Sequence, residues 1–332
     1  MNDARETSIW PGLAICLALA LAAFGLGTWQ PLVGGAVFAL VLGIAVNNLW
    51  QPPATVRPGV QLASKKILQA AIVALGGSLS LGQVLASGRH SLAVMLVTLV
   101  LALAAAFLYG RLLGVSRNLT RLVGVGTAIC GGSAIAAVAP IIEADDDEIA
   151  FSISTVFLFN LVAVLIFPLI GHALGLSDHG FGIWAGTAIN DTSSVVAAGY
   201  AYSPVAGDLA TITKLARTTM IVPISLVFAL LAAGGAKGRA AGYDWKRVMP
   251  WFILGFLAMA LVNSSGLLGP WFAHGAGAAG RFLILVALAG VGLGTDLRKL
   301  AATGPRPVLL GLLVWGTVAV SSLALQSFGR QW

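Results

Sequence analysis

Charged residues are scarce in this 332-residue sequence, of which only 9% is Asp, Glu, Lys or Arg. An average soluble domain contains about a quarter charged residues, which keep its surface hydrated. The scarcity therefore excludes a soluble globular protein. Apolar residues make up 58% of the chain, and the mean hydropathy is +0.94. We predict an all-α, polytopic membrane protein with one integral domain over residues 1–332.

Cysteine and the common catalytic motifs are also scarce or missing. Cys16 and Cys130 both lie in apolar stretches, which excludes a disulfide framework and a metal site. The sequence has no Gly-x-x-x-x-Gly-Lys-Ser/Thr, His-Glu-x-x-His or Gly-x-Ser-x-Gly motif. We therefore expect neither a nucleotide-driven pump nor an enzyme. A coupling H⁺ or Na⁺ is the only cofactor that the sequence leaves open.

Long apolar runs fill the chain almost without interruption. A membrane-spanning helix needs about 20 mostly apolar residues. We predict eleven transmembrane helices, at approximately 9–27, 31–49, 60–78, 89–110, 121–140, 148–170, 180–200, 208–233, 247–266, 279–296 and 305–325. Intramembrane asparagines, including Asn160, are expected to form interhelical hydrogen bonds.

The basic residues predict the orientation, because Lys and Arg accumulate in cytoplasmic loops. If all eleven segments cross, one side collects fourteen of the nineteen basic residues. These are Arg5, Arg57, Lys65, Lys66, Arg111, Arg117, Arg121, Lys237, Arg239, Lys246, Arg247, Arg298, Lys299 and Arg306. We predict a bacterial inner (plasma) membrane protein with a cytoplasmic N-terminus and a periplasmic C-terminus. The acidic cluster Glu143–Glu148 then falls on the outer side. The net charge of +7 reflects this topology and does not indicate nucleic-acid binding.

Two internal similarities indicate repeats. GTAICGGSAIAA (126–137) and GTAINDTSSVVA (186–197) are identical at six of twelve positions. The segments 74–85 and 287–300 are more weakly alike. An odd number of crossings separates the second pair, which favours inverted repeats, whereas two crossings separate the first, which favours parallel copies. A re-entrant or broken helix at one copy would change this parity.

Both copies of the GTAI motif contain a predicted helix break. Four glycines in the nine positions before Ser133 weaken the first helix, at about 1 kcal/mol each relative to alanine. In the second, five consecutive polar side chains from Asn190 compete with the helix for backbone partners. Irregular chain at membrane depth must line a cavity that the protein encloses. The candidate binding residues at the breaks are Cys130, Gly131, Gly132, Ser133, Asn190, Asp191, Thr192 and Ser193. A close helix-packing face is the structural alternative.

Three charged residues in and after the second break are also candidate site residues. An aspartate at the centre of a transmembrane helix costs about 2.5–3.5 kcal/mol, so Asp191 should face a cavity or serve as a cap. Lys214 and Arg217 lie three residues apart, on one helix face. Their counterion could be Asp191, a bound anion, or lipid head groups reached by snorkelling.

The motif residues resemble a known family. The strings GTAICGGSAIAAVAPII, GTAINDTSSVVAAG with the following TKLART, and GLGTDLRKL are similar to the YeiH-like sulfate exporter family of bacterial membrane proteins. The resemblance implies a transporter related to the cation/proton antiporters and bile-acid symporters, with inverted repeats and discontinuous helices. The chain departs from that pattern at Asn190–Ser194, where relatives tend to read His-Asp-Thr-Ala-Gln.

Three hypotheses of function follow. The leading one is a secondary transporter that exports a small inorganic or organosulfur anion by alternating access. The second is a cation/proton antiporter in which Asp191 carries the ion. The third is a non-transporting membrane scaffold or regulator. The expected partners are the anion and the lipid bilayer, and a homodimer is the one protein assembly left open.

Overall fold

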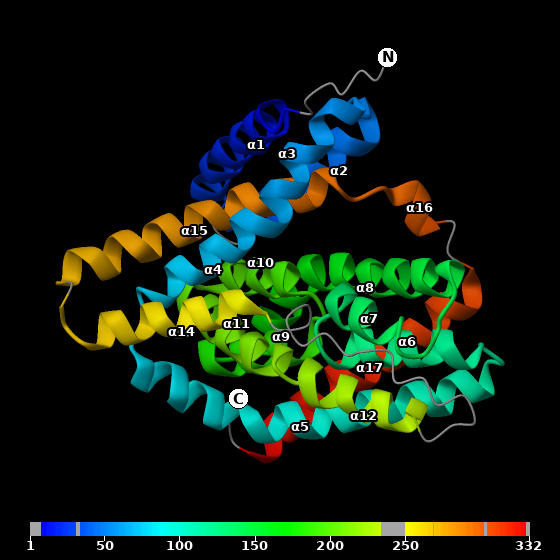
Figure 1. Ribbon diagram of the computed structural model, residues 1–332. Coiled ribbons are helices and arrows are strands. Elements are labelled where there is room, and N and C mark those ends of the chain that lie inside the picture. The colour runs from blue at the N-terminus through cyan, green and yellow to red at the C-terminus, as the bar shows by residue number, and fades with distance from the viewer. Residues whose placement is uncertain (1–7, 31–33, 234–249, 268, 302–303, 330–332) are drawn as a thin grey trace. The chain divides into compact units, whose positions relative to one another are not determined.

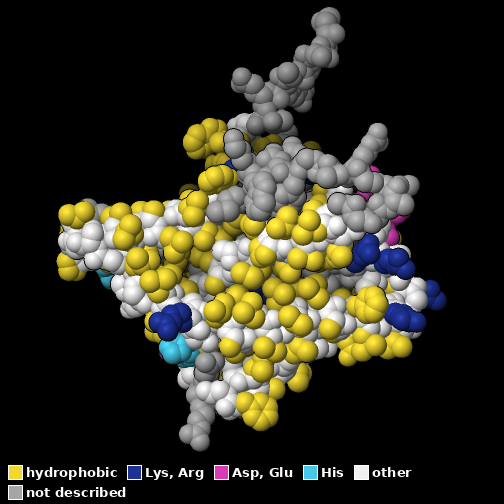
Figure 2. Space-filling view, turned by 60° about the horizontal axis from the view of Figure 1, so that its bottom comes forward, with side chains coloured by type: hydrophobic (Ala, Val, Ile, Leu, Met, Phe, Trp, Pro, Cys, Tyr) yellow, Lys and Arg dark blue, Asp and Glu magenta, His cyan; other side chains and the backbone are white. Residues whose placement is uncertain are grey.

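The computed structural model describes residues 8–30, 34–233, 250–267, 269–301 and 304–329, and this part of the chain contains helices and no strand (Figure 1). Six helices are long and apolar enough to cross a membrane. They are Trp10–Trp29, Leu81–Leu112, Asp146–Ala173, Pro204–Leu231, Pro270–Leu293 and Pro305–Phe328. Hydrophobic side chains are spread across the face seen in Figure 2, and the visible Lys and Arg side chains lie toward its left and right sides. The coarse prediction of a helical membrane protein is therefore confirmed.

The chain forms two compact units. The first comprises the described parts of Met1–Val84, Tyr200–Tyr202 and Phe252–Leu297. The second comprises those of Leu85–Gly199, Ser203–Trp251 and Arg298–Trp332. The expectation of a single membrane domain stays a prediction.

The first unit is an array of closely packed helices. Its elements are α1 (Trp10–Trp29), α2 (Gly34–Trp50), the 3-10 helix η1 (Ala54–Val56), α3 (Arg57–Gln61), the π-helix η2 (Leu62–Ile67), α4 (Leu68–Gly76), α14 (Trp251–Ser264) and α15 (Pro270–Leu293). Helices α3, η2 and α4 follow one another directly and correspond to the predicted span 60–78. Asn47 and Asn48 of α2 donate to the carbonyl of Thr295, as expected for intramembrane amides.

Small residues allow α2 and α15 to pack backbone against backbone. A β-carbon at Gly43 would lie 2.9 Å from the α-carbon of Gly292 and 2.5 Å from the carbonyl oxygen of Ala289. Backbone atoms cannot move aside as a flexible side chain can. Close packing through small residues is a principal attraction between helices in lipid.

We expect the substitution Gly43→Ala to destabilise the protein by about 1–3 kcal/mol, the usual range for overpacking. The matched control is Gly25→Ala in α1, where a β-carbon would meet nothing within 4 Å. Alanine is the better helix former, so the control should keep or slightly raise stability. Thermal unfolding of the two variants in detergent checks the difference. Equal melting temperatures would contradict the close contact.

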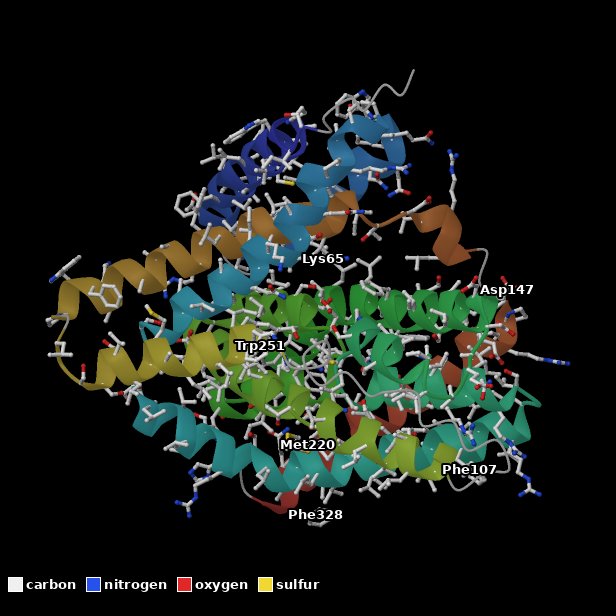
Figure 3. The ribbon with its side chains drawn as sticks, viewed as in Figure 1. Lys65, Phe107, Asp147, Met220, Trp251 and Phe328 are labelled. Atoms are coloured by element: carbon white, nitrogen blue, oxygen red, sulfur yellow. The ribbon has the colours of Figure 1, made fainter. Side chains whose placement is uncertain are left out.

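The second unit contains the remaining helices. They are α6 (Arg117–Ala128), α7 (Gly132–Val138), α8 (Asp146–Ala173), α9 (Asp178–Ala188), α11 (Pro204–Thr218), α12 (Ile221–Ala233) and α17 (Pro305–Phe328), together with most of α5 (Leu81–Leu112), α10 (Thr192–Tyr202) and α16 (Leu297–Ala301). Met220 marks the short turn between α11 and α12 (Figure 3). Stacked aromatic rings of Phe167, Trp184 and Trp315 join α8, α9 and α17 in the core.

Helices α6 and α7 form a hairpin that returns to the end from which it starts. The side chain of Ile135 in α7 folds back on α6, where a β-carbon at Gly126 would lie 2.9 Å from its Cδ1. Ser116, the N-cap of α6, donates to Glu148 in the first turn of α8 at 2.5 Å. The beginnings of α6 and α8 are therefore at the same end of this unit. We call residues 116–145 the first hairpin.

Helices α9 and α10 form a second hairpin of the same kind. Gly182 of α9 packs on Leu209 of α11, and Gly186 packs one turn further along, on Thr213, so α9 and α11 run parallel. Helix α10, which connects the two along the chain, must then run antiparallel to both. The contact that closes the loop is a 2.6 Å hydrogen bond from Ser203 Oγ to Asp178 Oδ1. We call residues 177–203 the second hairpin.

The two hairpins enter the second unit from opposite ends. Helix α8 has 28 residues, a length of about 42 Å, and carries the chain from the base of the first hairpin to within a few residues of the second. The half-helices α6 and α9 have 12 and 11 residues, or about 17 Å each, roughly half the thickness of a hydrocarbon core. Residues 121–140 and 180–200 therefore do not form the single long helices that we predicted for these spans.

The hairpins also change the position predicted for the acidic cluster. Asp145 caps α8 in a capping box with Glu148, and Glu148 accepts from Ser116. The cluster is thus at the end of the unit that contains Arg117, not at the opposite end. The error arose from counting the first hairpin as a crossing. Residues Lys237, Arg239, Lys246 and Arg247 lie outside the described residues.

Candidate functional site

Each hairpin has a short break in its helix at the same motif position. Helices α6 and α9 end at Ala128 and Ala188, the third residue of each Gly-Thr-Ala-Ile string. The next helices start at Gly132 and Thr192. We call residues 129–131 and 189–191 the first and second tips. The predicted discontinuities within 126–137 and 186–197 are confirmed.

The two tips meet inside the second unit. Gly131 has a φ of +69°, and a β-carbon there would lie 3.7 Å from the backbone nitrogen of Asp191 and 3.5 Å from Val156 Cγ1. Asn160 lies one turn after Val156 on α8, so both side chains are on one helix face. Asn160 Oδ1 accepts from the N–H groups of Asn190 and Asp191, at 3.0 and 3.1 Å. One face of α8 therefore contacts both tips.

Lys214 of α11 joins the two tips directly. Its Nζ donates to the carbonyl of Ile129 in the first tip at 2.7 Å and to that of Ile189 in the second at 3.0 Å. Both oxygens follow the C-terminal end of a half-helix, where the helix dipole is negative. The lysine is fully buried.

Arg217 is buried beside Lys214 and binds the end of α6 in the same way. Its Nε donates to the carbonyl of Ala128 at 2.6 Å, and its Nη2 donates to that of Thr127 at 3.0 Å. A membrane interior offers no water to such carbonyls, so the two cations satisfy groups that would otherwise be costly to bury. Because both side chains have 0% exposure, the snorkelling alternative is wrong.

Asp191 caps the half-helix that follows the second tip. Its Oδ2 accepts from the N–H groups of Ser193 at 2.9 Å and Ser194 at 3.4 Å, and from the Ser193 hydroxyl. The carboxylate makes no ion pair with Lys214 in the described part of the chain, so it is not the direct counterion that the sequence allowed. Two backbone amides of the second tip and two in the first turn of α10 are thus bound by Asn160 and Asp191.

The other predicted site residues surround the same point. Cys130 is a buried free thiol within the first tip. Gly132 begins α7, whose start has no side-chain cap, and Ser133 follows it with an exposed side chain. Thr192 is buried at the start of α10. The ten predicted residues therefore lie at the tips, in the first two residues of α7 and α10, or on α11, all within the second unit.

Several buried polar atoms at the tips have no hydrogen-bond partner among the described residues. They are Nη1 of Arg217, Nδ2 of Asn160 and Oδ1 of Asn190. Native proteins leave few buried polar groups unpaired, and such groups often mark a site that takes a ligand or water. The sequence predicted that Asn160 would form an interhelical hydrogen bond, and its oxygen does bind the chain after α9. One asparagine in an apolar helix gave no sign that its NH₂ group would be buried without a partner among the described residues.

Comparisons with known proteins agree with a membrane protein of this type. Residues 11–311 match the sequence model of the family described as Conserved hypothetical protein 698. The chain belongs to this family. Its curated relatives are named UPF0324 membrane proteins.

The UPF0324 relatives cover nearly the whole chain. A UPF0324 membrane protein of Streptococcus pyogenes serotype M6 is 43% identical over 326 residues, covering 95% of this chain and 96% of its own. One of Clostridium tetani is 40% identical over 308 residues, with 89% of each chain covered. One of Fusobacterium nucleatum is 37% identical over 339 residues, with 95% and 96% covered. These UPF0324 names give a membrane location and no substrate, so the sulfate exporter resemblance stays a prediction.

Proposed function

We propose that this protein is a secondary transporter that exports a small inorganic or organosulfur anion, such as sulfate, by alternating access. The observation that carries the proposal is the pair of buried cations at the point where two oppositely entering hairpins meet. Lys214 uses two of its three donors on carbonyls, and Arg217 Nη1 uses none within the described residues. These donors are available to a ligand at mid-depth.

The charge balance at the tips favours an anion. Two cations, Lys214 and Arg217, face one carboxylate, Asp191, which leaves one positive charge in excess. The dipole ends of the four half-helices largely cancel, because two C-terminal and two N-terminal ends converge. A buried unpaired charge is expensive, so an excess cation at this depth is best explained by an anion that binds and leaves.

The arrangement of the hairpins supports alternating access. Each GTAI hairpin is followed by a long helix, α8 or α11, that supplies a side chain to the tips. Only α8 crosses between the two hairpins, and an odd number of crossings gives the two copies opposite orientations. We therefore infer that residues 116–173 and 177–231 are inverted repeats. Transporters commonly place their substrate site at the interface of such repeats. The similarity of 74–85 to 287–300 stays a prediction.

The remaining parts of the proposal concern the protein's surroundings. Treating the two hairpins as non-crossing leaves every basic loop on its predicted side, so we retain a cytoplasmic N-terminus and a periplasmic C-terminus in a bacterial inner membrane. We propose no enzymatic activity, no nucleic-acid partner and no resident cofactor. A coupling H⁺ or Na⁺ and a homodimer remain part of the proposal.

A cation/proton antiporter is the second candidate, and two acceptor oxygens favour it. Oδ1 of Asn190 is buried without a partner, and all three hydrogen bonds to Asp191 go to its Oδ2. The free Oδ1 of Asp191 could accept a proton or a cation. In this reading Asp191 carries the transported ion and is not a coupling residue.

Flux through proteoliposomes separates the two functions. We expect the wild-type protein to accelerate uptake of radiolabelled sulfate, thiosulfate or isethionate over protein-free vesicles. Asp191→Asn should keep anion exchange at equal ion concentrations and lose its response to a pH or Na⁺ gradient. In the antiporter, the same variant loses all cation exchange. Asp147→Asn is the control, because Asp147 is exposed at the start of α8 (Figure 3). Absence of flux for all three anions under every gradient would overturn the anion proposal.

A further inference from the structure

The orientation of the Asn160 side-chain amide is fixed by the backbone of the second tip. Two N–H groups, from Asn190 and Asp191, converge on one atom of this amide. Only the carbonyl oxygen can accept two hydrogen bonds from N–H donors, so the oxygen and nitrogen positions cannot be exchanged. The NH₂ group must therefore point away from the second tip's amides. It is a donor with a known direction.

The NH₂ group of Asn160 is a buried donor without a partner. The residue is 2% exposed, and its Nδ2 makes no hydrogen bond with any described residue. Val156, one turn earlier on the same face of α8, lies beside Gly131 of the first tip. Asn160 thus binds the second tip and lies on the face of α8 that contacts the first, and Nη1 of Arg217 is a second buried donor without a partner among the described residues. Leaving a buried donor unpaired costs about 1–3 kcal/mol, which a ligand oxygen would recover.

We propose that Asn160 is a specificity-determining residue of the anion site, and this inference rests on the transport function proposed above. Its oxygen holds the second tip in place, and its NH₂ group donates a hydrogen bond to an oxygen of the bound anion. An oxyanion, which has several acceptor oxygens and no need to donate, is the ligand class that fits. The same side chain therefore couples the position of the second tip to the binding of the anion.

Asn160→Asp separates the two roles of the amide. The carboxylate keeps an oxygen for the two N–H groups and replaces the donor with a second acceptor. Asn160→Leu removes both. Asn118→Asp makes the same chemical change on α6, where the Oδ1 of Asn118 accepts from Arg121 at 3.4 Å. Without added anion, we expect Asn160→Asp and Asn118→Asp to unfold at nearly the wild-type temperature, and Asn160→Leu to unfold well below it.

Anion binding gives the decisive measurement. Thermal unfolding is followed in sodium sulfate, thiosulfate or isethionate, with sodium gluconate to match ionic strength. A ligand that binds the native state raises Tm by an amount that grows with its concentration relative to its Kd. At pH 8, the apparent Kd and the KM for flux should rise at least tenfold in Asn160→Asp, with kcat within twofold of wild type. A residue with a purely structural role would not raise KM while it leaves kcat unchanged.

The outcomes are distinguishable. If Asn160→Asp binds the anion as wild type does at pH 8, Asn160 is not a ligand donor, and the transport proposal stands without it. If Asn160→Leu is as stable as wild type, the amide oxygen does not hold the tip as described. If none of the three anions stabilises the wild-type protein or crosses the vesicle, the transport proposal itself fails, and this inference fails with it.

Discussion

The substitution Lys214→Met is expected to prevent the two hairpin tips from packing together, and to lower the stability of the protein by about 2–6 kcal/mol. The variant leaves the carbonyls of Ile129 and Ile189 buried without a donor, and each unsatisfied group costs about 1–3 kcal/mol. A loss of this size is a large part of the total stability of a typical protein, about 5–15 kcal/mol. Thermal unfolding in detergent, followed by tryptophan fluorescence, measures the effect.

The control for this prediction is another lysine in a helix. Lys66 lies in η2 and is exposed, so Lys66→Met removes a charge without uncovering a buried acceptor. We expect the control to unfold within a few degrees of wild type and Lys214→Met to unfold about 5–20 °C lower, or to fail to accumulate. A folded Lys214→Met variant with an unchanged melting temperature would show that the carbonyls find other partners.

The second large effect is an all-or-none pattern of chemical labelling. We expect cysteines introduced at Arg117, at the start of the first hairpin, and at Asp147, just after its end, to react with a membrane-impermeant maleimide from the same side of the membrane. Cysteines at Leu174 and Val205, which flank the second hairpin, should react only from the other side. All four side chains are exposed in the structure. Oppositely oriented membrane vesicles, in a background with Cys16 and Cys130 replaced by alanine, give the measurement.

The labelling pattern distinguishes hairpins from crossing helices. If residues 121–140 crossed the membrane, Arg117→Cys and Asp147→Cys would react from opposite sides. The same holds for Leu174→Cys and Val205→Cys if residues 180–200 crossed. Either result would contradict the return of the chain that the Ser116–Glu148 and Ser203–Asp178 hydrogen bonds indicate. Both native cysteines are buried, so the background substitutions should not alter exposed loops.

The sequence predicted the helical membrane class and the two helix breaks for clear physical reasons. In lipid, the backbone N–H and C=O groups of a long apolar run find partners only if the run is helical. Clustered glycines or polar residues weaken such a helix locally. The predicted break at Gly131 corresponds to a backbone with positive φ, which glycine alone adopts readily. The breaks therefore followed from local chemistry.

Whether a broken segment crosses or returns could not be read from the sequence. A hairpin of two half-helices has the same length and the same apolar content as one spanning helix. The difference depends on tertiary contacts, such as Gly182 against Leu209, that are local in space and distant along the chain. The partners of Lys214 and Arg217 were equally hidden, because backbone carbonyls carry no sequence signature.

Lys214 has a consequence for the order in which the chain can mature. The carbonyl of Ile129 that it binds lies 85 residues earlier in the chain. At a synthesis rate of about 5–20 residues per second, the first tip is made roughly 4–17 seconds before its ammonium partner exists. During that interval the carbonyl of Ile129 must accept a hydrogen bond from water or from another transient donor. The first hairpin can therefore reach its final position only after α11 has been synthesised. A late segment of the chain thus completes the folding of an earlier one.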